Sequence, residues 1–326
     1  MTDFKRYLLD EFIEDYQDGH LTRREALKLV AGITGSLALA NSILAACAPP
    51  QQATFTVQPT STAAPTDAPD PTQAAGPTSP PTTVAPEPSA TTAAPGEIEA
   101  GDVEFPAGEA TLIGYLARPA GDGPFPIVLV CHENRGLTDH IKDVTRRVAQ
   151  AGYIGLAVDL LSRQGGTAAL DPSSVPGLLS NTPADQFLQD FVSGLRWVQS
   201  QPYAQTDRVG MVGFCFGGGV TWRVAVGLPE LRATVPFYGP HPSPDEVASI
   251  QAAVLGIYAE RDTRINDGIP AIEAAMQQGG KTYEKVIYPN TDHAFHNDTS
   301  TRYNAEAAQD AWSRTLAWFE RHLRTP

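Results

Sequence analysis

The segment RVGMVGFCFGGGV (residues 208–220) places one candidate nucleophile between two glycines. Cys215 follows Gly213 by two residues and precedes Gly217 by two, where an apolar strand pattern changes to a glycine-rich helix start. A side chain on such a sharp strand-to-helix turn is exposed and strained, and its neighbours must be very small. The helix N-terminus offers N–H groups and partial positive charge, which favour a thiolate. The pattern predicts that Cys215 is a thiol nucleophile.

A thiol nucleophile needs a base and an acid that orients the base. Asp262, in YAERDTRI, and His293, in TDHAFHND, follow Cys215 in the order that a strand-to-helix nucleophile turn requires. We expect His293 to take the thiol proton and Asp262 to fix the imidazole tautomer. By sequence alone, Glu260 or Asp267 could replace the acid, and His296 could replace the base. We predict no metal, because a site built on His293 and His296 has no third ligand with convincing spacing.

Seven apolar, strand-like runs alternate with helical patterns in residues 97–326, which we expect to form one globular domain. This alternation predicts an α/β fold, with a mostly parallel sheet and helices on both faces. Reactive groups in such sheets gather beyond the carboxyl ends of the strands. The candidate residues that follow these runs are Glu133, Arg163, Cys215, Asp262 and His293. The runs are residues 111–119, 126–133, 153–160, 208–214, 232–239, 252–260 and 281–289.

Helical spacing also connects Phe187, Phe191, Leu195 and Val198, and a second such pattern runs through 312–323. Three cysteines do not suggest a disulfide framework. One of them, Cys131, lies inside a solid apolar run, which is typical of a packed core residue.

Five motifs together resemble the dienelactone hydrolase family of the α/β-hydrolase superfamily. In chain order they are CHENRG, DLLSRQG, GFCFGG, AERDTRI and DHAF, and the similarity covers residues 100–325. The resemblance implies an α/β-hydrolase fold. It also implies a hydrolase of carboxylic esters or lactones that uses a Cys-Asp-His triad, an acyl-enzyme intermediate and no cofactor.

The resemblance further assigns roles around the nucleophile. Glu133 would contact the resting, neutral thiol and take its proton when substrate binds. The backbone N–H groups of Asn134 and Phe216 would hold the oxyanion. Arg163 would pair with a substrate carboxylate or with Glu133 itself. Asn297 stands where well-studied members carry a second carboxylate-binding arginine, and it can donate hydrogen bonds but supplies no charge.

Residues 1–47 resemble an export signal. Arg23 and Arg24 precede a moderately apolar stretch, as in twin-arginine signals, and LAAC, ending at Cys47, is similar to a lipoprotein cleavage box. A membrane-spanning helix that is never cut is the alternative, although the run is short and polar for one. Upstream, FKRYLLDEFIEDYQDG predicts an amphipathic helix, to which we assign no function. We expect an exported lipoprotein, anchored to the membrane through Cys47 at the cell surface or in the periplasm.

Residues 48–96 contain no Lys or Arg and are dominated by Pro, Thr, Ala and Ser, so we expect a disordered linker. The net charge of −14, without a basic patch, argues against a nucleic-acid partner. We expect a monomer that acts on a small ester or lactone.

Two other classes of function are open at this point. One is a non-catalytic, ligand-binding lipoprotein on a hydrolase scaffold. The other is redox chemistry at Cys215, which the lack of a nearby partner cysteine disfavours.

Overall fold

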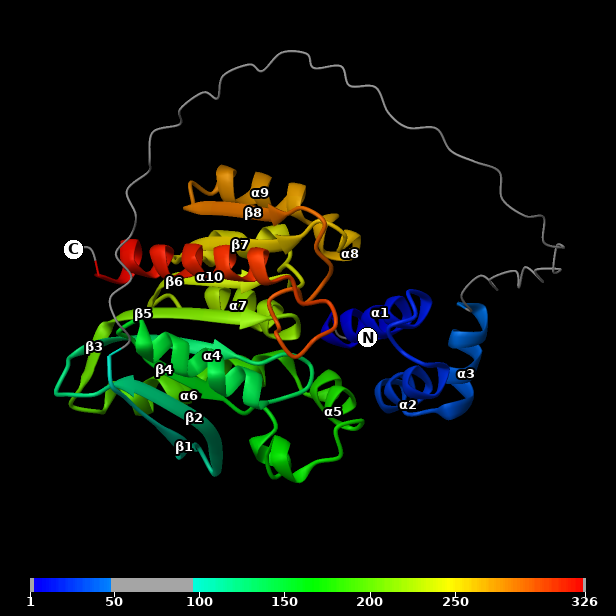
Figure 1. Ribbon diagram of the computed structural model, residues 1–326, viewed down its shortest axis with the longest axis horizontal. Helices are drawn as coiled ribbons and strands as arrows, with labels where there is room; N and C mark the ends of the chain where they lie inside the picture. Colours follow the sequence, from blue (N-terminus) through cyan, green and yellow to red (C-terminus); the bar gives the residue numbers. More distant parts are fainter. Residues whose placement is uncertain (1–2, 48–95, 325–326) are drawn as a thin grey trace, which may run out of the picture. The chain divides into compact units, whose positions relative to one another are not determined.

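The structure is a computed structural model that describes residues 3–47 and 96–324 (Figure 1). The predicted linker, 48–96, therefore lies outside the described residues except for Gly96. The remaining residues on both sides of it belong to one contact unit, which holds the predicted leader together with the α/β part.

An eight-stranded sheet forms the centre of the α/β part, in the order β1-β2-β4-β3-β5-β6-β7-β8. Strands from β4 across to β8 pair in parallel, and the pairs β1–β2 and β2–β4 are antiparallel. The mostly parallel sheet predicted from the alternating runs is thereby confirmed. The strands are β1 (Ile98–Ala107), β2 (Ala110–Pro119), β3 (Phe125–Cys131), β4 (Ile154–Val158), β5 (Ala204–Phe214), β6 (Leu231–Phe237), β7 (Ala253–Ala259) and β8 (Tyr283–Tyr288).

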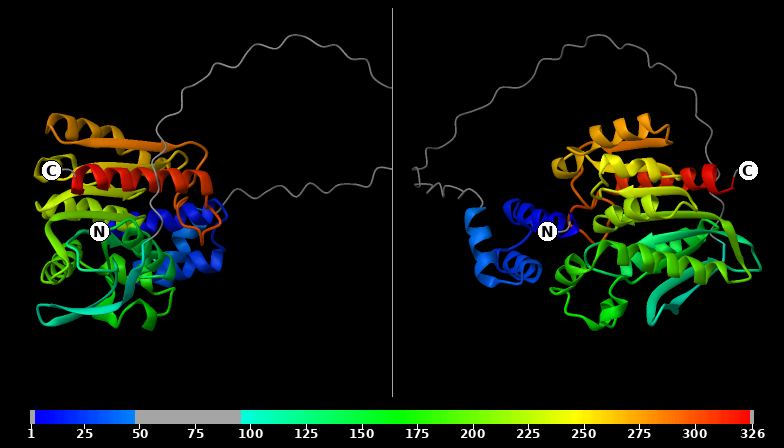
Figure 2. Two further views of the ribbon diagram at one scale, coloured as in Figure 1. Left: turned by 60° about the vertical axis from the view of Figure 1, so that its left-hand side comes forward. Right: turned by 180° about the vertical axis from the view of Figure 1, so that it is seen from behind.

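Helices cover both faces of the sheet, as Figures 1 and 2 show. Helices α4 and α10 lie on one face, and α6, α7 and α9 lie on the other. This explains why the central strands β4 and β7 are buried along their whole length and have continuous apolar sequences. The helices of this part are α4 (Asp139–Gln150), α5 (Val175–Asn181), α6 (Ala184–Gln199), α7 (Phe216–Gly227), α8 (Thr263–Asn266), α9 (Ile269–Gln278) and α10 (Ala305–Phe319).

The predicted helical stripe of α6 is confirmed, because Phe187, Phe191, Leu195 and Val198 are all fully buried. The stripe predicted for 312–323 is confirmed only in part. Trp312 is half-buried, and Ala311, Thr315 and Trp318 supply much of the buried face of α10 instead.

Strand β1 was not predicted from the sequence. Its residues IEAGDVEFPA alternate polar and apolar types without an apolar run, because β1 is an edge strand with one neighbour and mostly exposed or half-buried side chains. Its full register with β2, from Ile98 opposite Pro119 to Ala107 opposite Ala110, makes a hairpin.

The predicted leader folds into three helices, α1 (Asp3–Gln17), α2 (Arg23–Thr34) and α3 (Leu37–Ala46). A capping box between Thr22 and Glu25 starts α2, and Gly35 in the left-handed conformation ends it. Ser36 then caps α3, so the apolar stretch is divided into two short helices. Among the described residues, no helix combines the length and apolar character needed to cross a membrane.

Candidate active site

Cys215 occupies the turn between β5 and α7, as predicted. Its backbone is strained, with φ 59° and ψ −124°, a region that residues with a side chain rarely adopt. The residue stands at the N-cap of α7, and Phe216 is the first residue of that helix. The first N–H groups of a helix have no partner inside the helix, so the N–H of Phe216 is available to an oxyanion beside the sulfur.

The two glycines of the motif are required by close backbone packing. A Cβ on Gly213 would collide with the carbonyl oxygen of Gly217, and a Cβ on Gly217 would collide with the carbonyl oxygen of His132. The strand, the turn and the helix can therefore approach this closely only with glycine at both positions.

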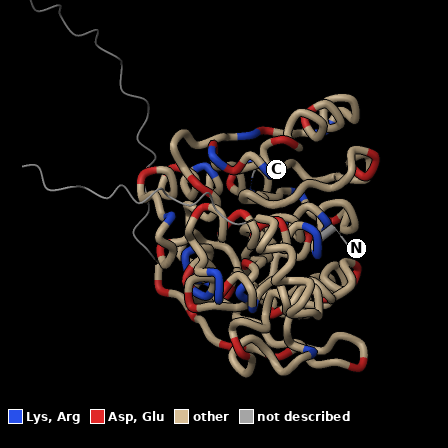
Figure 3. The backbone as a smooth tube through the Cα atoms, turned by 90° about the vertical axis from the view of Figure 1, so that its right-hand side faces the viewer, with Lys and Arg blue, Asp and Glu red and all other residues tan. Residues whose placement is uncertain are grey.

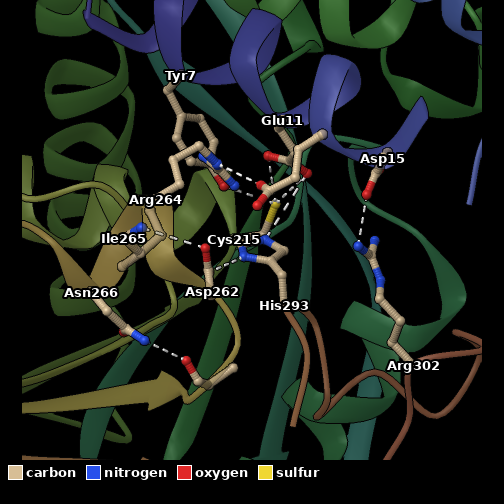
Figure 4. A network of polar contacts seen from close by, with 12 residues as sticks. Tyr7, Glu11, Asp15, Cys215, Asp262, Arg264, Ile265, Asn266, His293 and Arg302 are labelled. Carbon is tan, nitrogen blue, oxygen red and sulfur yellow. Dashed lines mark hydrogen bonds and ion pairs between the residues drawn. The ribbon is translucent and has the colours of Figure 1, made fainter. Parts of the chain in front are cut away.

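His293 and Asp262 come together beside Cys215 (Figure 4). Nδ1 of His293 lies 2.5 Å from Oδ2 of Asp262, which is the N-cap residue of α8 just after β7. The other ring nitrogen, Nε2, has no hydrogen-bond partner among the described residues. A ring nitrogen of His293 and the sulfur of Cys215 lie within 4.8 Å of each other. This geometry orients the imidazole so that Nε2 can take the thiol proton.

The electrostatics of the pair favour proton transfer to the imidazole. Burial lowers the pKa of His293, but the carboxylate of Asp262 and then Cys215 outweigh burial and hold the pKa well above its usual value. Burial raises the pKa of Asp262, and the facing His293 outweighs it, so that this pKa lies below the usual value. The acid therefore stays ionised and strengthens the base.

Glu11, on helix α1, is a residue of this site that sequence reasoning missed. It is 4% exposed, and its Oε1 accepts a hydrogen bond from Nδ2 of Asn134 at 2.8 Å. The sulfur of Cys215 contacts the same Oε1 at 3.5 Å and also lies 3.5 Å from the hydroxyl of Tyr7. The helical pattern of this segment puts Glu11 one turn after Tyr7, but it does not indicate which surface the helix contacts.

Two of the influences on the thiol favour its neutral form. Burial, followed by the carboxylate of Glu11, raises the pKa of Cys215 above its usual value. A buried thiol beside a carboxylate needs a base to become a nucleophile, which is the role that the position of His293 allows.

Glu133 does not contact the sulfur in this structure. Its Oε2 accepts a hydrogen bond from Nδ2 of Asn297 at 2.6 Å, and among the described residues it is Glu11 that supplies the carboxylate next to Cys215. Burial raises the pKa of Glu133, although His140 and the bond from Asn297 act in the opposite direction. A raised pKa makes a carboxylate a stronger proton acceptor. The role of Glu133 as acceptor of the thiol proton stays a prediction.

Arg163 is engaged elsewhere. Its guanidinium donates to Oδ1 of Asp190 at 2.7 Å, and the Asp190 side chain is 1% exposed on α6. The residues that line the cavity of about 380 Å³ around Cys215 do not include Arg163. Its predicted pairing with Glu133 or with a substrate carboxylate stays a prediction, since the structure gives it a different partner.

The alternative acids and base have other surroundings. His296 stacks on Phe214 with ring centroids 5.0 Å apart, and burial lowers the pKa of His296 to about 3. Glu260 accepts a hydrogen bond from the backbone N–H of Asn290. Asp262 and His293 are thus the acid and the base that the structure pairs.

A thiol, an imidazole and a carboxylate are also ligand types for zinc. The donor atoms of Glu11, Cys215 and His293 all lie within 4.8 Å of one another, which would let one ion contact all three. The thiol and the imidazole already form the nucleophile and base of a triad, and we assign them to that chemistry.

The nucleophile turn after β5, followed in the chain by the acid after β7 and the histidine after β8, defines an α/β-hydrolase. The chain belongs to the dienelactone hydrolase family, whose family model matches residues 112–323. Membership makes it a hydrolase of the carboxylic ester class. The resemblance found in the five motifs is confirmed, and helix α1 lies outside the matched residues.

Individual relatives agree with this assignment. A candidate carboxymethylenebutenolidase of Methylorubrum extorquens is 37% identical over 256 residues, covering 73% of this chain and 86% of the relative. The crystal structure of a candidate dienelactone hydrolase of Klebsiella pneumoniae is 35% identical with a TM-score of 0.65, covering 69% of this chain and 100% of that one. A further solved structure is the dienelactone hydrolase-like promiscuous phosphotriesterase P91 from metagenomic libraries. It is 24% identical with a TM-score of 0.60, and the match covers 70% of this chain and 99% of that one. At this identity the likeness shows the fold alone.

Proposed function

We propose that this chain hydrolyses carboxylic esters or lactones through an acyl-enzyme on Cys215. The observation that carries the proposal is the strained turn at Cys215 beside an imidazole whose far nitrogen is bonded to Asp262 at 2.5 Å. Backbone strain of about 1–3 kcal/mol is retained where the surrounding structure requires it, typically at active sites. A protein that only binds a ligand has no need of this strain or of a paired base.

In the acylation step, Nε2 of His293 takes the proton of the thiol and the sulfur bonds to the carbonyl carbon. The carbonyl oxygen becomes an oxyanion, which the N–H groups of Phe216 and Asn134 stabilise. The C–O bond to the alcohol then breaks, and the alkoxide takes the proton from His293. For a lactone, the alcohol stays attached to the acyl group.

In the deacylation step, a water molecule gives a proton to His293 while its oxygen bonds to the thioester carbon. The C–S bond breaks, the acid leaves, and the proton returns from the imidazole to the sulfur. Asp262 stabilises the imidazolium in both steps. In this proposal the thiol proton reaches His293 either directly or by way of Glu133, which leaves Asn297 when substrate binds and passes the proton on to the imidazole.

The assay compares hydrolysis of a small activated ester and a small lactone by the full chain, its Cys215→Ala variant and its Cys131→Ala variant. Cys131 is a second fully buried cysteine, on β3, and serves as the matched control. Because α1 contacts the sulfur, the same comparison is repeated in a Glu11→Ala background. In the Glu11→Ala background we expect hydrolysis to be lost only with Cys215, and equal rates in both cysteine variants of that background would refute the proposal.

We also propose that the chain is exported and anchored by lipid on Cys47. Support comes from the twin arginines at 23 and 24 and from the LAAC sequence, with Cys47 at the end of α3. Mass spectrometry of the membrane fraction is expected to find an acylated N-terminal Cys47. A membrane-bound form that keeps Met1 would contradict this.

A further inference from the structure

Helix α1 lies against the catalytic site and presents a row of polar side chains to it (Figure 4). Tyr7, Glu11 and Asp15 are spaced four residues apart on one face, and all three are buried. Glu11 and Asp15 line the cavity around Cys215 together with His293 and Asn297. The segment predicted to be the start of an export leader therefore forms one wall of the active site.

The carboxylate of Glu11 occupies the place that a substrate acyl group needs. A reacting carbonyl must lie about 3–3.5 Å from the nucleophile. Oε1 of Glu11 lies 3.5 Å from the sulfur of Cys215 and 4.0 Å from Nε2 of His293. Only 3% of Cys215 is exposed to solvent. A substrate carbonyl and the Glu11 side chain cannot both be next to the sulfur.

Complementary charges fix α1 in this position. Arg302, on the loop after His293, donates to Asp15 at 2.7 Å, with 18% and 12% of the two side chains exposed. Arg264, on α8, donates to Glu14 at 3.1 Å, and its guanidinium lies 4.5 Å from the centre of the Tyr7 ring. Figure 3 shows that acidic and basic residues are otherwise interspersed along the described backbone.

Apolar contacts complete the attachment. The Phe4 ring packs on Phe216, the residue after the nucleophile, with ring centroids 5.0 Å apart, and on Phe187 of α6 at 5.8 Å. Leu8 and Phe12 are 0% and 3% exposed. Helix α1 also packs on α2, and it is Phe4 that attaches α1 by apolar contact to α6 and to the first turn of α7.

We propose that α1 is an intramolecular inhibitor, which holds the hydrolase inactive in the precursor until the leader is removed at Cys47. Inhibition by α1 rests on the proposed function, in which Cys215 is the nucleophile. Docking is intramolecular in the precursor, so modest contacts suffice to close the site. Cleavage before Cys47 takes all of α1 out of the mature chain.

The alternative is that Glu11 is a catalytic carboxylate, which α1 contributes to the site. In that case α1 has to remain docked while substrate reaches the sulfur. The contact of Oε1 with the sulfur and with Asn134 leaves the acyl position filled, which favours inhibition. The two readings predict opposite changes in hydrolysis when docking is weakened.

The test uses the full chain and two readouts, with EDTA present so that no metal ion covers the site. The first is the rate at which iodoacetamide alkylates Cys215, measured by mass spectrometry of the peptide that contains it. The second is hydrolysis of a small activated ester. Asp15→Lys faces Arg302 with a like charge. The control Asp10→Lys makes the same change on the same helix, where the half-exposed Asp10 pairs with the exposed Arg6.

We expect Asp15→Lys to raise both rates by about tenfold, and Asp10→Lys to leave both near the wild-type values. The double variant Asp15→Lys/Arg302→Glu restores an opposite-charge pair and is expected to slow alkylation again. This return would trace the faster alkylation of the single variant to the charge of this pair.

Each remaining outcome is informative. Unchanged alkylation in Asp15→Lys, or faster alkylation that the double variant does not reverse, would overturn docking by this pair. Faster alkylation with slower hydrolysis would overturn inhibition in favour of a catalytic Glu11. Faster alkylation with no hydrolysis in any variant would support occlusion by α1 and refute the hydrolase function instead.

Discussion

Three residues carry the chemistry of the site, namely the nucleophile Cys215, the base His293 and the acid Asp262. Gly213, Cys215 and Gly217 form a local pattern whose cause is steric, so the sequence indicates the turn directly. Asp262 and His293 are predictable from their places after strand-like runs. The partner of the thiol was not predictable, because Glu11 is 204 residues away from Cys215 in the chain and meets it only through tertiary packing.

The variant Asp262→Asn tests whether Asp262 is the carboxylate that orients His293. In the Asp15→Lys background, where α1 is released, we expect kcat/KM for a small activated ester to fall by about 10²–10⁴, because the imidazole loses its orientation and its ionic partner. Glu260→Gln changes the rival acid and is expected to leave kcat/KM unchanged. A similar loss in both variants would contradict the assignment of Asp262.

The pH dependence of alkylation tests the electrostatics of the thiol. The Glu11 carboxylate raises the pKa of Cys215. The other titratable or charged groups that interact with this thiol are Tyr7, Cys131, Glu133, Tyr238, His293 and Arg302. A neutral side chain at position 11 removes a negative charge beside the thiolate, so the pKa of the thiol falls. We therefore expect Glu11→Gln to move the midpoint of the alkylation profile to lower pH. Glu133→Gln is expected to move the midpoint less. A shift of the midpoint to higher pH in Glu11→Gln would contradict the claim that the Glu11 carboxylate raises the pKa of Cys215.

Elements position these residues, and the central ones were predictable because burial on both faces requires continuous apolar strands. Strand β1 escaped prediction because an edge strand needs no such run. The docking of α1 also escaped prediction, since its helical periodicity indicates a buried face but not the surface that buries it.

The packing of β3 against α7 gives a prediction on stability. Gly217→Ala places a Cβ against the carbonyl oxygen of His132, and we expect a loss of about 1–3 kcal/mol in the free energy of unfolding, together with loss of hydrolysis. Gly101→Ala, on β1, meets no atom within 4 Å and is the control. Urea unfolding of both variants measures the difference, and equal stability would contradict the close approach.

The whole molecule combines a family hydrolase with an N-terminal helical segment that packs on it. The family match begins at residue 112, so nothing in the family motifs predicts what α1 does. Export of a folded precursor and removal of its leader, as the sequence of residues 1–47 suggests, would join localisation to activation.

Ionic strength tests this arrangement as a whole. The Debye length falls from about 10 Å at 0.1 M salt to about 3 Å at 1 M, which weakens charge pairs at the edge of α1. We expect alkylation of Cys215 in the wild-type chain to accelerate with added NaCl. In Asp15→Lys, where Arg302 faces a like charge, added NaCl is expected to bring no such acceleration. A wild-type rate that does not respond to salt would mean that α1 is not held by its more exposed charges, because salt screens the largely buried Asp15–Arg302 pair only weakly.

The central claim is that the sulfur of Cys215 carries the acyl group during hydrolysis. Mass spectrometry of the chain quenched shortly after mixing with an activated ester tests it directly. We expect one added acyl mass on the peptide that contains Cys215, which accumulates in the Asp15→Lys chain and is absent from the Cys215→Ala chain. Continued ester turnover with no acyl group on Cys215, or undiminished turnover in Cys215→Ala, would contradict the account.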